Sequence, residues 1–152
     1  MSEAIGAQPK RRRSARVILF DPDGQVLLIR FHVSRSDGAF IFWATPGGSV
    51  EDGEAERDAA RRELMEELGL DLHLEGPVHT ITATFEHKGE PVSNTDVYFV
   101  GRCDRNAPAL DPQELEERLA MREMRWWSIN DLEGTAETIF PSDLAKVVRE
   151  LT

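Results

Sequence analysis

One segment near the middle of the chain limits the choice of fold more than any other. Residues 55–68 are rich in helix-favouring Ala, Glu, Arg, Leu and Met, and Gly69 is a typical residue for ending a helix. On this helix Ala60, Leu64 and Leu68 form a narrow apolar stripe, which is suited to packing on a sheet. Strand-like segments precede and follow the helix, so the pattern predicts a mixed sheet held between helices.

The same helix brings three carboxylates together within one turn. Glu63, Glu66 and Glu67 stand at i, i+3 and i+4. Repulsion at this spacing costs a helix about 0.2 to 0.5 kcal/mol per pair, so local stability does not explain the arrangement. A divalent cation does explain it, because Mg²⁺ is usually held by a few carboxylates together with substrate phosphates. The turn at Gly47 and Gly48 would supply a further carbonyl ligand.

The alternative interpretation is a solvated acidic helix face, which is the commonest role of clustered glutamates. Such a face usually mixes lysines among its glutamates, whereas here Arg62 is the only basic residue within reach of the three. Spacing alone leaves the two interpretations evenly matched.

Alternating and apolar segments predict the rest of the secondary structure. Strands are expected at residues 14–20, 25–31, 40–43, 78–85, 96–103 and 124–129. In the aromatic strand, Phe40 and Phe42 would face one side, and Ile41 and Trp43 the other. The helix at 55–68 has Asp52 as its best capping candidate, a short turn or helix is expected at 130–132, and a last helix is expected from Ser142 to Leu151. Residues 32–39 are expected to be flexible.

Length and composition favour one water-soluble domain. The chain has 152 residues, of which 40% are hydrophobic, and no apolar run approaches the roughly 18 residues of a membrane span. We expect a flexible tail over residues 1–13 and a single domain over residues 14–152. The N-terminus lacks the apolar segment of a secretory signal, so a cytoplasmic location is expected. Cys103 is the only cysteine, which excludes an intrachain disulfide and a zinc cluster built on cysteines.

The charge balance bears on possible partners. The net charge is −10, with 28 acidic against 18 basic residues, and this argues against broad electrostatic binding to nucleic acid. Small anions are compatible with it where a metal screens their charge. The basic run Lys10–Arg13 is interpreted as part of a solvated, mobile tail in preference to an anion-binding arm.

The stretch from Gly48 to Leu70 resembles the Nudix box. That motif reads glycine, five residues, glutamate, seven residues, arginine, glutamate, an aliphatic residue, any residue, two glutamates, any residue, glycine and an aliphatic residue. The chain fills every fixed position, with Gly48, Glu54, Arg62, Glu63, Leu64, Glu66, Glu67, Gly69 and Leu70. The similarity extends to residues 43–48 before the box and to residues 125–132 near the end of the chain.

This resemblance implies the Nudix α/β/α sandwich and a metal-dependent hydrolysis. The bond would be a diphosphate linkage in a nucleoside diphosphate joined to another group, as in a nucleoside triphosphate, a nucleotide sugar or a dinucleoside polyphosphate. The implied cofactor is Mg²⁺ or Mn²⁺. By match to the motif, Glu66 and Glu67 are the main ligands and Glu63 is a ligand or the general base. Arg62 orients these glutamates, and Glu54 supports the loop.

In many members of the family the general base lies outside the box, on a later loop. The candidates in this chain are Glu114, Glu116 and Glu117, and no motif selects among them. The resemblance therefore leaves the general base open.

Substrate recognition outside the diphosphate is less constrained. Phe40, Phe42 or Trp43 could stack a base, and Arg30 or Arg35 could hold an outer phosphate, although aromatic residues within strands are more often core residues. The region from Phe40 to Phe42 is also a candidate interface for a homodimer.

Two other functions on the same fold compete with hydrolysis. A nucleotide-sensing domain binds without cleaving, but such domains commonly lose box glutamates and this chain keeps them all. An isomerase of prenyl diphosphates would need a catalytic cysteine in a characteristic setting, which Cys103 lacks. The sequence favours a pyrophosphohydrolase that acts on a small-molecule nucleotide, with no nucleic-acid or membrane partner.

Overall fold

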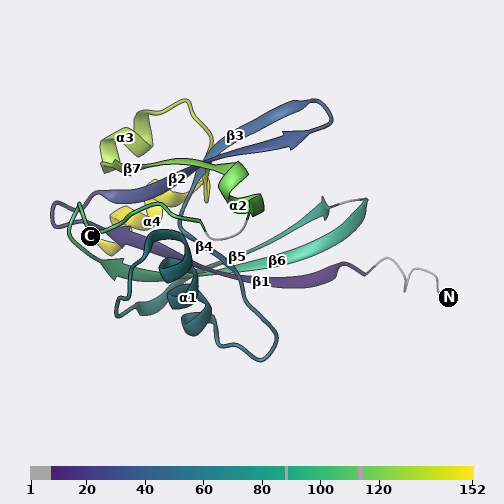
Figure 1. Ribbon diagram of the computed structural model, residues 1–152, viewed down its shortest axis with the longest axis horizontal. Helices are drawn as coiled ribbons and strands as arrows, with labels where there is room; N and C mark the ends of the chain where they lie inside the picture. Colours follow the sequence, from purple (N-terminus) through teal and green to yellow (C-terminus); the bar gives the residue numbers. More distant parts are fainter. Residues whose placement is uncertain (1–7, 88, 113–114) are drawn as a thin grey trace.

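The computed structural model describes residues 8–87, 89–112 and 115–152 (Figure 1). Within these residues the strands form one mixed, eight-stranded sheet. The strands are β1 (Lys10–Phe20), β2 (Val26–Arg35), β3 (Gly38–Ala44), β4 (Gly47–Ser49), β5 (Glu75–His87), β6 (Glu90–Arg102), β7 (Met121–Trp127) and β8 (Ile139–Phe140). The helices are α1 (Glu56–Leu68), α2 (Leu115–Ala120), α3 (Ile129–Gly134) and α4 (Leu144–Leu151).

The sheet divides into two arms. The strand order is β5-β6-β1-β2-β3-β8, but β1 and β2 are paired only at Phe20 and Val26. Beyond this pair, β1 continues beside β4 and β6, while β2 continues beside β3 and β7. We call these the β1 arm (β1, β4, β5 and β6) and the β2 arm (β2, β3, β7 and β8). Figure 1 shows the two arms diverging, with α2 between them.

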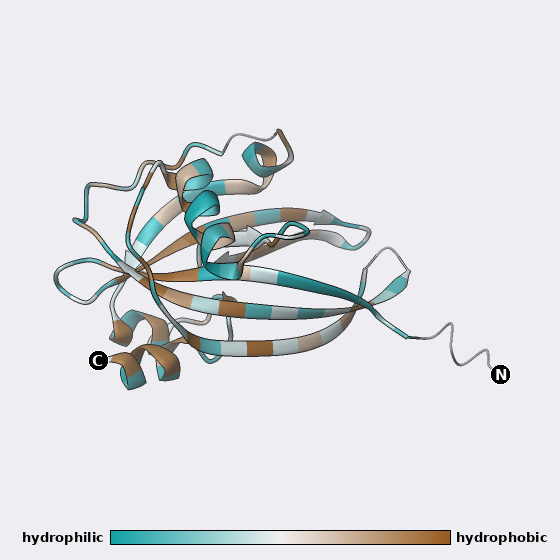
Figure 2. Ribbon diagram, turned by 90° about the horizontal axis from the view of Figure 1, so that it is seen from below, coloured by the Kyte–Doolittle hydropathy of each residue, from teal (hydrophilic) through white to brown (hydrophobic). Residues whose placement is uncertain are grey.

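Hydrophobic residues are concentrated where the arms meet (Figure 2), and they form two cores. On β1, Val17 and Leu19 pack in the core under α1, whereas Ile18 and Phe20 pack in the core that includes α3 and α4. A strand that is buried on both sides explains why residues 17–20 form a continuous apolar run. The predicted mixed sheet held between helices is therefore confirmed.

The basic run belongs to β1, so the predicted tail is too long. Lys10 to Arg13 pair in parallel register with Val92 to Thr95 of β6, and the strand begins at Lys10 and not at Ser14. Backbone pairing with a neighbouring strand orders these residues although their side chains carry no hydrophobic signal. Residues 1–7 of the predicted tail lie outside the described residues.

The bounds of other strands also differ from the prediction, because backbone pairing orders residues that carry no hydrophobic signal. The segment predicted to be flexible, 32–39, forms a hairpin, because β2 and β3 pair from Ile29 and Ala44 out to Arg35 and Gly38. Strands β5 and β6 are longer than predicted and pair from Glu75 to His87.

Helix α1 begins at Glu56 without a side-chain cap, so Asp52 does not cap it, and it ends at Gly69 with φ of 67° as predicted. Helix α4 begins at Leu144 and has no side-chain cap either.

None of the helices in the described part of the chain has both the length and the apolar character needed to cross a membrane.

Candidate active site

A cleft of about 820 Å³ lies between the two arms. The β1 arm lines it with Arg12, Ser14 and Arg16 of β1 and with residues of β5 and β6, including Asn94 and Asp96. The β2 arm lines it with Phe31 and Val33 of β2, Phe42 of β3 and Phe140 of β8. Glu67 of α1, Gly47 of β4 and Glu117 of α2 also line it. Because β1 and β2 separate after one pair, α1 can present Glu67 to this cleft, which we call the fork cleft.

Helix α1 lies close to the β1 arm because its packing residues are small. Ala59 and Ala60 are fully buried beside Leu64 and Leu68. Gly48 of β4 contacts the Glu63 carboxylate so closely that an added Cβ would lie 2.7 Å from the carboxylate carbon. A side chain at position 48 would therefore displace Glu63, and this gives a steric reason for glycine at the first position of the motif.

Three carboxylates converge at the base of the fork cleft. Glu63, Glu67 and Glu117 each offer an oxygen within 4.8 Å of the others, and we call them the carboxylate cluster. Glu63 and Glu67 are 7% and 1% exposed. Their Oε2 atoms are buried and have no hydrogen-bond partner among the described residues. Buried polar atoms are nearly always satisfied, and a set of hard oxygen donors of this kind could hold Mg²⁺ or Mn²⁺.

The protonation of the cluster follows from its burial. Burial raises the pKa of Glu67 to about 8, and the Glu63 and Glu117 charges add to this effect, whereas the Gly47 N–H and Arg16 oppose it. Burial likewise raises the pKa of Glu63, against the opposing effect of Arg62. A divalent cation would restore the charged forms, because it replaces the lost hydration with direct ligation.

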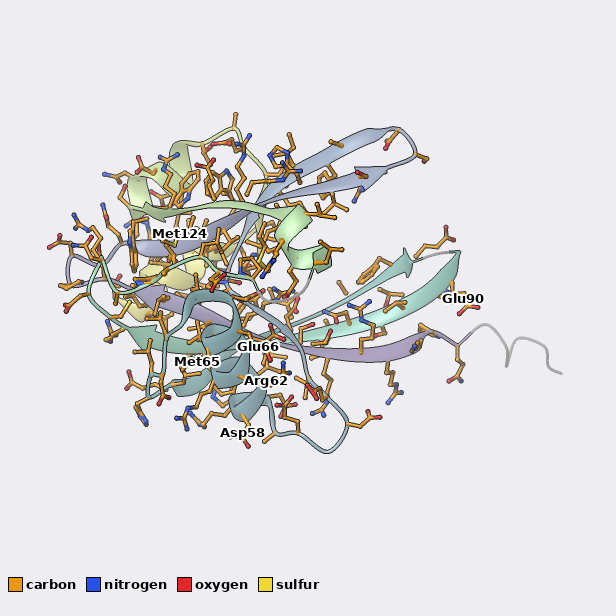
Figure 3. All side chains as sticks on the ribbon, in the orientation of Figure 1. Asp58, Arg62, Met65, Glu66, Glu90 and Met124 are labelled. Atoms are coloured by element: carbon orange, nitrogen blue, oxygen red, sulfur yellow. The ribbon has the colours of Figure 1, made fainter. Side chains whose placement is uncertain are left out.

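Arg62 connects the box loop to the helix. Its Nε and Nη2 donate to the two Glu54 carboxylate oxygens, both at 3.0 Å, and Nη2 also donates to the Ser49 carbonyl at 3.0 Å. Its Nη1 donates to Glu63 Oε1 at 3.1 Å and to Glu66 Oε2 at 3.4 Å. Arg62 and Glu66 project from the same side of α1 (Figure 3). The roles expected for Arg62 and Glu54 stay predictions, with which these contacts are compatible.

Glu66 differs from the other two box glutamates. Its side chain is 39% exposed and bonds to Arg62, and the carboxylate cluster does not include it. Its predicted role as a main ligand has less geometric support than that of Glu67. Sequence spacing had placed the three box glutamates together and could not rank them by burial.

Gly47 orients Glu67 through its backbone. Its N–H donates to Glu67 Oε1 at 3.0 Å, and its carbonyl accepts from Arg16 Nη1 at 3.3 Å. Gly47 has φ of 141°, and an added Cβ would lie 2.2 Å from the Ala15 carbonyl oxygen. Only glycine fits this position, and its N–H fixes one oxygen of the buried carboxylate.

The structure describes the side chain of one of the three candidates for a base outside the box. Glu117 lies on α2 and joins the carboxylate cluster. Glu114 lies outside the described residues, and the side chain of Glu116 is not described. Sequence patterning could not select Glu117, because its approach to α1 depends on how the chain returns across the fork.

Only some of the predicted substrate-binding residues line the fork cleft. Phe42 lines the fork cleft, where its ring stacks on Phe31 at 5.2 Å between centroids. Trp43 is 3% exposed and packs in the core against Trp127, so it does not support the predicted stacking role. Arg30 pairs with Glu123, and Arg35 lies over the Phe40 ring, so neither faces the cleft. A dimer interface at 40–42 remains a prediction.

Sequence reasoning missed the polar residues of the β1 arm that line the cleft. Arg12, Ser14 and Arg16 alternate along β1 and therefore share one face, as do Asn94 and Asp96 along β6. This period of two is visible in the sequence once both strands are extended to their true starts.

Comparison with known proteins agrees with the motif and the geometry. The sequence model of the NUDIX domain matches residues 10–151. The chain belongs to the NUDIX family. Among solved structures, the fold of this NUDIX domain is similar to that of a MutT protein from Methanosarcina mazei Go1, with a TM-score of 0.70, 19% identity and coverage of 94% of both chains.

Two curated relatives that are more than 40% identical match this NUDIX domain over shorter segments. An RNA pyrophosphohydrolase of Caulobacter vibrioides is 44% identical over 62 residues, which are 41% of this chain and 34% of the relative. The nucleoside triphosphatase NudI of Escherichia fergusonii is 41% identical over 68 residues, which are 43% of this chain and 45% of the relative. The aligned segments thus span between a third and a half of these relatives, and their activities are theirs.

Proposed function

We propose that this NUDIX domain hydrolyses a diphosphate linkage in a nucleoside diphosphate joined to another group, with Mg²⁺ or Mn²⁺ as its cofactor. The observation that carries the proposal is the carboxylate cluster, in which two buried glutamates have unpartnered oxygens at the base of an open cleft. The names of the relatives support it, because both describe hydrolysis of phosphate anhydrides.

Glu63 and Glu67 would hold the cation, because both are buried and both offer an oxygen without a hydrogen-bond partner among the described residues. When bound, the cation would supply a Lewis acid for the phosphoryl oxygen and would lower the pKa of a water. The Gly47 N–H holds Glu67 Oε1, and Arg62 holds Glu63 Oε1, so each ligand has one oxygen fixed by the protein. The box loop and α1 are in this way kept in one arrangement before substrate binds.

Glu117 is the candidate general base. It approaches the other two glutamates from α2, on a separate element, and it is only partly buried. A carboxylate in this position can accept the proton of an attacking water and return it to solvent. Glu66, held by Arg62 beside the cluster, is a further candidate ligand.

The test is a screen of nucleoside triphosphates, nucleotide sugars and dinucleoside polyphosphates with Mg²⁺ or Mn²⁺, following release of phosphate or pyrophosphate. We expect turnover of at least one class, and at least a roughly 100-fold lower kcat in Glu67→Gln. The matched control is Glu150→Gln, an exposed glutamate on α4, which should keep full activity. Full activity in Glu67→Gln would refute the metal assignment, whereas tight nucleotide binding without turnover would favour the sensing function.

A further inference from the structure

The fork cleft contains a row of polar side chains that the hydrolytic site does not use. Arg12 and Ser14 of β1 lie beside Asn94 and Asp96 of β6, in the register Arg12 to Asn94 and Ser14 to Asp96. All four line the cleft, although the surrounding positions of β5, Ile81, Ala83 and Phe85, are apolar. A polar row on an apolar wall is a typical arrangement for fixing the orientation of a ligand.

Hydrogen bonds hold the middle of this row in place. Ser14 Oγ donates to Asn94 Oδ1 at 3.2 Å, and Asn94 Nδ2 donates to Asp96 Oδ1 at 3.1 Å. Arg16 Nε lies 3.6 Å from the same Asp96 oxygen. Asn94 is 9% exposed, whereas the Asp96 side chain is 25% exposed. Because a carboxylate offers about four acceptor positions, Asp96 is oriented by these contacts and can still accept from a ligand.

Arg12 supplies donors at the other end of the row. It is half-buried in the cleft wall, and the described part of the chain gives its guanidinium no ion pair or side-chain hydrogen bond. Arg12 and Asp96 lie on adjacent parallel strands, offset by two residues, and long side chains can bridge this separation. The row therefore presents a donor group and an acceptor group side by side.

The opposite wall is aromatic. The Phe31 and Phe42 rings are nearly parallel, with 9° between their planes, and Phe140 meets Phe42 edge-on at 5.3 Å. Phe140 is 43% exposed, so this wall is accessible to a ligand. A flat ring entering the cleft would stack on the aromatic wall and present its polar edge to the polar row.

We propose that the row from Arg12 to Asp96 selects a guanine base. Guanine offers two adjacent donors, N1–H and the 2-amino group, which match the two oxygens of one carboxylate. It also offers O6 and N7 as acceptors, and these are the atoms that arginine contacts in pairs. Adenine would turn its N1 lone pair towards Asp96 and its amino group towards Arg12, so both contacts would be unfavourable.

The base and the diphosphate would occupy one continuous site. The inference therefore rests on the proposed function, which places the diphosphate at the carboxylate cluster. Arg16 connects the two ends, because its Nε approaches Asp96 and its Nη1 donates to the Gly47 carbonyl. Gly47 in turn donates to Glu67. The substrate class that fits is a guanosine 5′-diphosphate joined to a further group.

The experiment compares kcat/KM for GTP, ATP and XTP in the wild type and in Asp96→Asn, with Mg²⁺. The wild type should prefer GTP to ATP by about 10- to 100-fold, the range expected for hydrogen bonds to a charged group. Asp96→Asn should lose about the same factor on GTP and gain on XTP. Xanthine has a carbonyl where guanine has the 2-amino group, and the asparagine amide can donate to it while its oxygen accepts from N1–H.

Two further variants separate recognition from folding. Arg12→Met should reduce the GTP to ATP ratio without the gain on XTP, because it removes only the donor to O6 and N7. Thr95→Ala is the control, since Thr95 lies on the other face of β6 and pairs with Thr82. It should keep the wild-type ratio. The gain on XTP in Asp96→Asn also shows directly that the variant is folded.

Binding distinguishes failure of this inference from failure of the proposed function. Calorimetry with GDP and ADP is carried out on Glu67→Gln, which is expected to be inactive but keeps the whole row. Tighter binding of GDP supports the guanine assignment even if no triphosphate is hydrolysed by the wild type. Equal binding of GDP and ADP, or an unchanged GTP to ATP ratio in Asp96→Asn, would overturn it.

Discussion

At the scale of single residues, Arg62 shows how the site is kept in order. Its guanidinium donates to both oxygens of Glu54, to the Ser49 carbonyl and to the carboxylates of Glu63 and Glu66. Arginine can make these contacts together because its guanidinium is planar and carries five N–H groups in fixed directions. The Glu54 side chain is 18% exposed, and its bond to Arg62 is the largest of the effects that lower its pKa.

Arg62→Lys keeps the charge but removes this geometry. A lysine ammonium cannot bond to both oxygens of Glu54 and also reach Glu63 from the same position. We expect kcat to fall by about tenfold with little change in KM, and the free energy of unfolding to fall by about 1 to 2 kcal/mol. Steady-state kinetics and urea unfolding measure the two effects.

The matched control is Arg61→Lys, because Arg61 is half exposed and its ion pair among the described residues is with Asp71 at the surface. It should change both quantities little. Equal effects of the two substitutions would mean that the planar guanidinium of Arg62 contributes nothing beyond its charge.

At the scale of elements, the short strand β4 connects α1 to the sheet. It pairs with β1 through Gly47, Gly48 and Ser49, which lie opposite Arg16, Ala15 and Ser14. Its two glycines allow the strand to pass close to both β1 and Glu63. The candidate active site thus depends on a short strand in which side chains at positions 47 and 48 would not fit.

Gly47→Ala tests this dependence. The added Cβ would meet the Ala15 carbonyl, and φ of 141° is strained for alanine, so β4 must shift and withdraw its N–H from Glu67. We expect a loss of about 2 to 4 kcal/mol in the free energy of unfolding and at least a roughly tenfold loss of kcat.

Gly53→Ala is the control for backbone strain alone. Gly53 also has positive φ, at 80°, but an added Cβ there meets nothing within 4 Å. Its cost should stay near 1 kcal/mol and its effect on kcat should be small. A Gly47→Ala enzyme as active as Gly53→Ala would contradict the role given to β4.

How far the sequence predicts these elements depends on what positions each one. Helix α1 was found almost in full because its period and its C-terminal Gly69 are local signals. The start of β1 was missed because Lys10 to Arg13 are ordered by pairing with β6, which no local pattern records. The strand β8 was missed because two residues, Ile139 and Phe140, carry too little pattern.

The same distinction applies to the site. Glu63, Glu66, Glu67 and Arg62 are within five positions of one another, so spacing was enough to group them. Glu117 was one of three equal candidates in the sequence, and only the position of α2 relative to α1 brings it to Glu63 and Glu67. The alternation of Phe42 and Trp43 was predicted, but which of the two faces is the cleft follows from the fork in the sheet.

At the scale of the whole molecule, the fork explains how one sheet has both a core and a cleft. Where the arms meet, β1 is buried on both faces, and where they diverge its outer half is hydrophilic (Figure 2). The carboxylate cluster lies near the junction, where buried charge is costly without a cation. Stability and metal binding should therefore be linked.

This linkage predicts an unusual pH dependence for the metal-free protein. The pKa of Glu67 rises from 4.5 to about 8 on folding, so the folded state binds the proton more tightly than the unfolded state. The stability that protonated Glu67 contributes is then fully present below pH 4.5 and is lost as the pH rises towards 8. We expect the free energy of unfolding to fall by on the order of 2 to 4 kcal/mol between pH 5 and pH 9.

Thermal unfolding in chelator at a series of pH values measures this effect, and saturating Mg²⁺ should restore most of the lost stability at pH 9. In Glu67→Gln, the dependence on pH should be weaker. A metal-free wild type that is as stable at pH 9 as at pH 5 would show that Glu67 is not protonated in the fold.

The most direct test of the central claim is a Mn²⁺ titration of the wild type and of Glu67→Gln, in which the electron paramagnetic resonance signal reports free Mn²⁺. If Glu63 and Glu67 hold the cation, the wild type should bind Mn²⁺ and Glu67→Gln should bind it at least about 100-fold more weakly. The same Kd for the two proteins would contradict the account, because the cation would then be held elsewhere.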